Sequence, residues 1–171
     1  IVMNDVWRSR DGINWELAAA DAGWDKMMNA ALVPMGDRLV LFGGDRYTGR
    51  GSRFQVWESR DGVNWSVEAD EKGIKVLNDA GIRNSFINIA RLNDMVYLAD
   101  RDIVDTRNGR TFAKTVLPED MIEFPGHLGN SVTITRKGRE YLVVKEGEEF
   151  FAARDFNKWT KMSYNFADDF K

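Results

Sequence analysis

Cysteine is absent from this chain of 171 residues, and histidine occurs only once. The lack of cysteine excludes disulfides, thiolate metal ligands and a cysteine nucleophile. A single histidine also excludes a zinc site built from three histidines of this chain. No apolar run approaches about 18 residues, so the sequence contains no candidate transmembrane helix. The sequence therefore predicts neither a metal nor a cofactor.

An excess of charge of one sign is also missing. Lysine and arginine number 24 against 27 aspartates and glutamates, which gives a formal net charge of −3. Because nucleic-acid binding needs a basic excess on one face, we do not expect a nucleic acid as partner. The apolar share of 43% is sufficient for a sizeable core.

What the chain does contain is a β-hairpin sequence written twice. Residues 6–15 read VWRSRDGINW and residues 56–65 read VWESRDGVNW. Alternating apolar residues typical of strands lead into Asp-Gly, a pair that tolerates the positive φ of a tight turn. Two weaker copies follow, and aligning all four on their aromatic residue gives spacings of 50, 47 and 47 residues. A period of this length with a β signature indicates a propeller or an array of sheets.

The repeated turn residues are predicted to be structural. An aspartate in such a turn accepts hydrogen bonds from nearby backbone N–H groups, a serine assists it, and the tryptophan packs over the hairpin. Metal binding by the aspartates is the minor alternative. The fourth copy has Phe156 where the others have glycine. The structural set comprises Ser9, Asp11, Gly12, Trp15, Ser59, Asp61, Gly62, Trp65, Asn108, Gly109, Phe112, Asp155 and Trp159.

The pattern predicts an all-β chain that forms a single segment, 1–171, of a β-propeller with four-stranded antiparallel blades. We expect a half-blade at 4–19, blades at about 30–69, 85–116 and 131–162, and a tail at 163–171. Segments 21–29 and 69–77 lack a sustained period of 3.6 and are predicted to be loops with helical turns. Because closed propellers have four to eight blades, about three and a half blades predict an incomplete ring or one closed by another chain.

Two further features carry a resemblance to a known family. Ser-x-Asp-Gly-x-x-Trp occurs at 9–15 and 59–65, and Phe-Gly-Gly occurs at 42–44. The chain thereby resembles the kelch-type and Asp-box β-propellers, which are galactose-oxidase-like and sialidase-like. Its turn is one residue shorter than the usual Asp-box spacing, and the arginine and histidine that often precede the innermost strand are missing. The resemblance implies a propeller over residues 4–162 and a secreted, periplasmic or cell-surface location, but it does not select one function.

Candidate ligand contacts lie on the face formed by the loops between blades and between second and third strands. Arginines there could hold a carboxylate or sulfate, and a tyrosine or tryptophan could stack on a sugar. A solvated basic loop is the alternative. The single histidine lies near three acidic residues and could act as a general base, although an ordinary surface histidine is the simpler interpretation. The candidates are Trp24, Arg46, Tyr47, Arg50, Arg83 and His127.

The predicted function is non-catalytic recognition of a glycan or protein on this loop face, and no catalytic residue is assigned. The alternative is a segment of a sialidase-like glycoside hydrolase whose catalytic residues lie partly in missing blades. Arg46, Arg83 and Arg101 could then converge on a substrate carboxylate, but no motif identifies the tyrosine and glutamate that such an enzyme needs. A third possibility is a purely architectural repeat.

Overall fold

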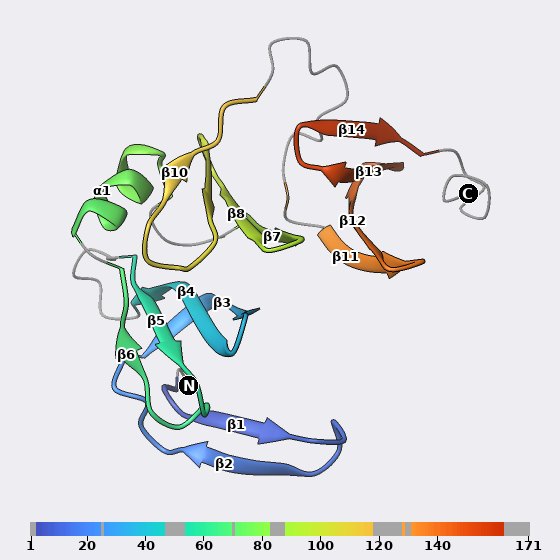
Figure 1. The fold of residues 1–171 in the computed structure, drawn as a ribbon. Helices are drawn as coiled ribbons and strands as arrows, with labels where there is room; N and C mark the ends of the chain where they lie inside the picture. The colour runs from blue at the N-terminus through green and yellow to red at the C-terminus, as the bar shows by residue number, and fades with distance from the viewer. Residues whose placement is uncertain are drawn as a thin grey trace.

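The computed structural model describes residues 3–24, 26–46, 54–69, 71–82, 88–117, 128 and 131–162. Over these ranges the chain forms one two-stranded sheet and three four-stranded antiparallel sheets, each with its strands in sequence order. Figure 1 shows the four sheets following one another around an arc, with the first strand of each four-stranded sheet nearest the centre. The predicted all-β propeller fold is confirmed. No helix among the described residues is long and apolar enough to cross a membrane.

The sheets are named here as a half-blade and blades 1 to 3. The half-blade contains β1 (Val6–Ser9) and β2 (Trp15–Ala19). Blade 1 contains β3 (Met27–Met35), β4 (Arg38–Arg46), β5 (Val56–Ser59) and β6 (Ser66–Val67). Blade 2 contains β7 (Asn88–Leu92), β8 (Met95–Ala99), β9 (Ile103–Thr106) and β10 (Ala113–Lys114). Blade 3 contains β11 (Ser131–Arg136), β12 (Arg139–Glu146), β13 (Glu149–Asp155) and β14 (Lys158–Lys161).

The core lies between blades. Successive side chains of a strand point to opposite faces of its sheet, and each face packs against an adjacent blade. Between blades 1 and 2, Val40, Phe42, Leu98 and Val104 are fully buried in one apolar cluster. A second cluster joins blades 2 and 3. In it the ring of Phe156, the residue that departs from the repeat, stacks on Tyr97 with ring centroids 3.7 Å apart and an interplanar angle of 8°.

One predicted loop is a helix. The sequence predicts a loop with helical turns at 69–77, whereas α1 (Glu71–Asp79) is a continuous α-helix that lies between blades 1 and 2. The helix ends in a Schellman motif at Gly81, which has a φ of +84°. There the N–H of Ile82 donates to the carbonyl of Leu77 at 2.9 Å, and that of Gly81 donates to Asn78 at 3.0 Å. Leu77 and Ile82 are both buried, so packing between blades stabilises a helix that periodicity does not reveal.

Candidate functional site

The repeated turns use their polar side chains locally. At Asp61, Oδ1 accepts hydrogen bonds from the backbone N–H groups of Val63 and Asn64, both at 2.8 Å, and Oδ2 accepts one from the Asn64 amide at 2.7 Å. The Ser59 hydroxyl accepts a bond from the Gly62 N–H at 2.9 Å. These bonds, led by those from Asn64, hold the pKa of Asp61 well below its usual range.

The first and third copies of the turn repeat this geometry. Asp11 accepts bonds from the backbone of Ile13 and Asn14, and its pKa is lowered for the same reason, with Asn14 as the largest cause. In blade 2 the amide oxygen of Asn108 accepts from the N–H groups of Arg110 at 2.8 Å and Thr111 at 2.9 Å. The oxygens of these turns therefore accept hydrogen bonds from the backbone and side chains of their own turn.

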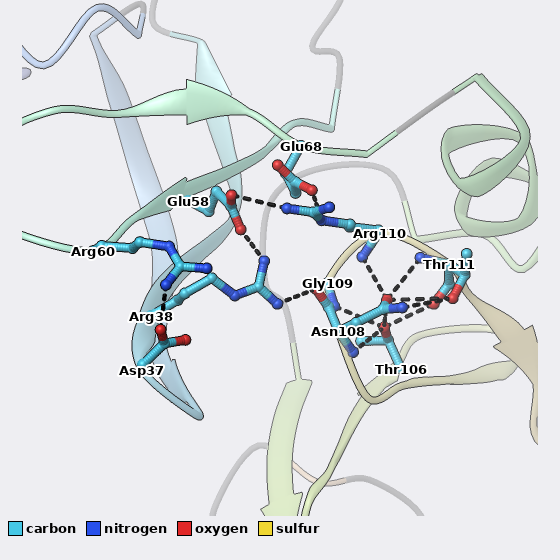
Figure 2. Close-up of polar contacts among 10 residues, drawn as sticks. All are labelled: Asp37, Arg38, Glu58, Arg60, Glu68, Thr106, Asn108, Gly109, Arg110 and Thr111. Carbon is cyan, nitrogen blue, oxygen red and sulfur yellow. Dashed lines mark hydrogen bonds and ion pairs between the residues drawn. The ribbon is translucent and has the colours of Figure 1, made fainter.

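Blades 1 and 2 are joined by a partly buried charge network, shown in Figure 2. Arg38 on β4 pairs with Glu58 on β5, and the two side chains are 13% and 14% exposed. Arg38 also donates to the carbonyl of Asn108 at 3.0 Å. From blade 2, Arg110 pairs with Glu58 at 3.1 Å and with Glu68. Both glutamates are thus bound by arginines, which suits a structural joint between blades better than proton transfer.

An open pocket of about 780 Å³ lies between the outer strands of blade 1 and helix α1. Its lining includes the apolar residues Phe54, Val67 and Ile74 and the polar residues Gln55, Glu71 and Asn78. The amide oxygen of Gln55 accepts a hydrogen bond from the indole N–H of Trp57 at 3.1 Å. In a meander, the start of β5 and the end of β6 lie at the same edge as the loops between blades, so this pocket is on the predicted loop face. An apolar wall with a few convergent polar groups is the usual make-up of a small-molecule site.

The acidic residues of this pocket do not form a glycosidase pair. Glu71 and Asp79 are eight positions apart on α1, which places them about 12 Å apart along the helix axis. The carboxyl groups of glycosidases are about 5–9.5 Å apart. Asp79 is also paired with Lys75. The pocket is therefore suited to binding through Asn78 and Glu71 rather than to bond cleavage by its acidic groups.

Of the predicted ligand contacts, the structure describes the side chain of Trp24 only. Trp24 is only 8% exposed and packs edge-on against Trp57 and Trp65, with ring centroids 5.9 and 4.9 Å away. It therefore has a structural role in this chain, in place of the free ring face that the sequence interpretation assigned to it. Arg46 ends β4, and the structure describes only its backbone. The other candidates, Tyr47, Arg50, Arg83 and His127, lie outside the described residues.

The structure brings together residues that sequence reasoning did not select. Gln55 and Asn78 line one pocket although they are 23 positions apart in the chain. The sequence signal that could have found this wall is the Schellman pattern at 77–82, because it predicts a helix end. Arg101, the third arginine of the sialidase alternative, instead donates to the carbonyl of Asp79 at the end of α1. In the part of the chain that the structure describes, no three histidine, aspartate or glutamate side chains cluster as metal ligands.

No family model and no curated protein matches the chain. Among solved structures, it is similar to an α-L-arabinofuranosidase from Fusarium graminearum, in complex with an iminosugar inhibitor. The identity is 15% over 92% of this chain and 54% of that one, with a TM-score of 0.53. It is also similar to the GH32 β-fructofuranosidase of Bombyx mori, at 15% identity over 94% and 42% of the chains and a TM-score of 0.49.

A third solved structure comes from the GH130 family, described as containing glycoside hydrolases that target β-1,2 mannosidic linkages in Candida mannan. Its identity is 16% over 96% of this chain and 56% of that chain, with a TM-score of 0.47. The chain thus spans about half the length of the solved structures that it matches. The similarity to the arabinofuranosidase supports the propeller fold and not the narrower kelch or Asp-box assignment.

Proposed function

We propose that this chain is part of a carbohydrate-active β-propeller and binds a glycan on its loop face. The observation that carries the proposal is the pocket between blade 1 and α1, where Asn78 and Glu71 lie beside apolar residues. Amides and carboxylates beside an apolar surface match the alternating hydroxyl and C–H groups of a sugar. The fold likeness to an arabinofuranosidase over 92% of the chain is in keeping with this chemistry.

The pocket also includes a residue that follows one of the candidate segments in the sequence. Residues 47–53 lead directly into Phe54, and segment 83–87 directly follows Ile82 at the end of the helix cap. A glycan held at the pocket would therefore lie near Phe54, the residue that follows segment 47–53. The secreted, periplasmic or cell-surface location expected from the sequence is part of the same proposal.

Non-catalytic recognition remains the second candidate because of the innermost strands. In their described residues, β3, β7 and β11 carry no aspartate or glutamate. Hydrolysis of a glycosidic bond by the usual route needs two facing carboxyl groups. A hydrolase would have to supply that pair from elsewhere in the propeller, whereas a binding module would need none.

The test is titration of the purified chain with arabino-, fructo- and manno-oligosaccharides in a calorimeter. We expect one of these to bind, and we expect Asn78→Ala to weaken that binding about fivefold, the loss of one hydrogen bond. Asn157→Ala, which removes an exposed amide from blade 3, serves as the control and should leave binding unchanged. Failure of all three sugar classes to bind at millimolar concentration, or equal binding by both variants, contradicts the proposal. Release of nitrophenol from the matching nitrophenyl glycosides separates hydrolysis from recognition.

A further inference from the structure

The half-blade carries an exposed apolar face formed by Trp7, Trp15 and Leu17, which we call the Trp7–Trp15 face. Trp7 lies opposite Leu17 and Ser9 lies opposite Trp15 in the β1–β2 ladder, so these side chains share one side of the hairpin. They are 51%, 58% and 49% exposed, respectively. Large apolar side chains gathered on one exposed face mark an interaction site more often than scattered ones do.

Blade 1 contains the same arrangement. Trp57 lies opposite Val67 in the β5–β6 ladder, and Trp65 takes the position of Trp15 in the repeated sequence. The indole N–H groups are fixed by equivalent bonds in both copies. Trp7 donates to Asp5 at 2.6 Å, as Trp57 donates to Gln55 at 3.1 Å.

The second tryptophan of each pair is held in the same way. Trp15 donates to the carbonyl of Gly12 at 3.3 Å, and Trp65 donates to that of Gly62 at 3.2 Å. The ring orientations of the Trp7–Trp15 face are therefore already set by local hydrogen bonds. A site formed before its occupant arrives loses less entropy on binding.

In blade 1 this ring pair holds the indole of Trp24. Its interplanar angles of 69° and 80° with Trp57 and Trp65 are those of edge-to-face contacts. The loop that carries Trp24 is fixed by Asp21, whose carboxylate accepts bonds from the Gly23 N–H at 2.9 Å and the Asn4 amide at 2.8 Å. The occupant is thus an aromatic side chain on a short Asp-x-Gly loop.

The other copies of the repeated aromatic residue also have an edge-on aromatic partner. Phe112 meets Phe42 at 83°, and Trp159 meets Phe156 at 78°. Trp65 has Trp24. Within the described ranges, Trp15 is the one copy without such a contact.

We propose that the Trp7–Trp15 face is a docking site for a polypeptide loop outside residues 1–171, which inserts an aromatic ring edge-on as Trp24 does on blade 1. The occupant has the chemistry of residues 21–24, an aspartate, a glycine and an aromatic residue in one tight loop. A further propeller blade is the kind of structure that places such a loop beside β1 and β2. This inference does not depend on whether the propeller binds a sugar.

The first probe is a nonapeptide, Ala-Ala-Ala-Asp-Ala-Gly-Trp-Asp-Lys, which copies residues 18–26. The chain has six tryptophans, so the indole N–H signals of the ¹⁵N-labelled protein report each ring separately by NMR. We expect millimolar peptide to shift the signals of Trp7 and Trp15. The signals of Trp57 and Trp65 should stay in place because Trp24 occupies that copy. The same peptide with alanine in place of its tryptophan should shift none of them.

A second version tethers the peptide to the N-terminus through a flexible Gly-Ser linker, which raises its effective concentration to the millimolar range. The same two signals should shift at any protein concentration. Unchanged Trp7 and Trp15 signals in the tethered protein would overturn the proposal. Shifts that follow protein concentration without peptide would assign the face to a second copy, and shifts caused by an oligosaccharide but not by the peptide would assign it to a glycan. Either of these results also contradicts the proposal.

Discussion

Gly109 of blade 2 lies so close to Val40 of blade 1 that a Cβ atom on the glycine would meet Val40 Cγ1 at 2.9 Å. Gly109 also has a φ of +70°, a conformation that other residues adopt at a cost. Because Val40 is fully buried, it has little room to move. We expect Gly109→Ala to lower the free energy of unfolding by about 2–4 kcal/mol, the sum of backbone strain and overpacking. Denaturation by urea measures this change.

Gly138 provides the matched control for that substitution. Its φ is +72°, but no atom lies within 4 Å of a Cβ placed there. Gly138→Ala should therefore show the strain alone, about 1 kcal/mol. Equal losses of unfolding free energy from the two substitutions would mean that the close contact between Gly109 and Val40 adds nothing to the cost of Gly109→Ala.

Replacement of Arg38 tests the charge network between blades 1 and 2. Arg38→Met leaves the carbonyl of Asn108 without its donor and removes one of the two arginines that bind Glu58. Because the side chains of Arg38 and Glu58 are mostly buried, we expect a loss of about 2–4 kcal/mol in unfolding free energy. Arg60→Met is the control, since Arg60 and its partner Asp37 are 70% and 69% exposed and such pairs contribute about 1 kcal/mol at most. A loss for Arg38→Met no larger than that of the control would refute the structural role of the network.

The hydrogen bonds of the Asp61 turn predict that the stability of the folded chain depends on pH in the acidic range. The pKa of Asp61 is lower in the folded chain than its ordinary value of about 3.9. Its contribution is therefore fully present above the ordinary pKa and is lost as the pH falls below it. Asp61→Asn keeps the acceptor oxygen, as Asn108 does in blade 2, but cannot titrate. We expect the gap in urea midpoint between the wild type and Asp61→Asn to narrow between pH 5 and pH 2, and a constant gap contradicts the assignment.

Trp24→Ala should be far more costly than Trp7→Ala. Trp24 is 8% exposed between two other indoles, whereas Trp7 is 51% exposed. The buried replacement leaves a cavity, for which about 3–5 kcal/mol is usual, and the exposed one should cost less than about 1 kcal/mol in the isolated chain. Thermal denaturation of both variants measures the difference. Similar losses would show that Trp7 is as well covered in solution as Trp24, which contradicts the exposure of Trp7 in the structure.

The turns and the blade order were accessible from the sequence because they depend on short-range chemistry. An Asp-Gly pair, a serine two positions before the aspartate and an aromatic residue four positions after it specify a turn through bonds that span two or three residues. The alternation of apolar residues specifies strands in the same local way. A fourfold repeat of these signals was sufficient to predict a half-blade and three four-stranded blades.

Long-range packing decided the rest. Helix α1 is stabilised by burial of Leu77 and by Arg101, which binds its last turn from 22 residues away. Trp24 lies in a loop whose sequence suggests an exposed ring, and it is buried only because blade 1 places Trp57 and Trp65 beside it. The pocket joins Gln55 to Asn78 for the same reason. Burial depends on which surfaces the folded chain brings together, and a pattern of neighbouring residues does not contain that information.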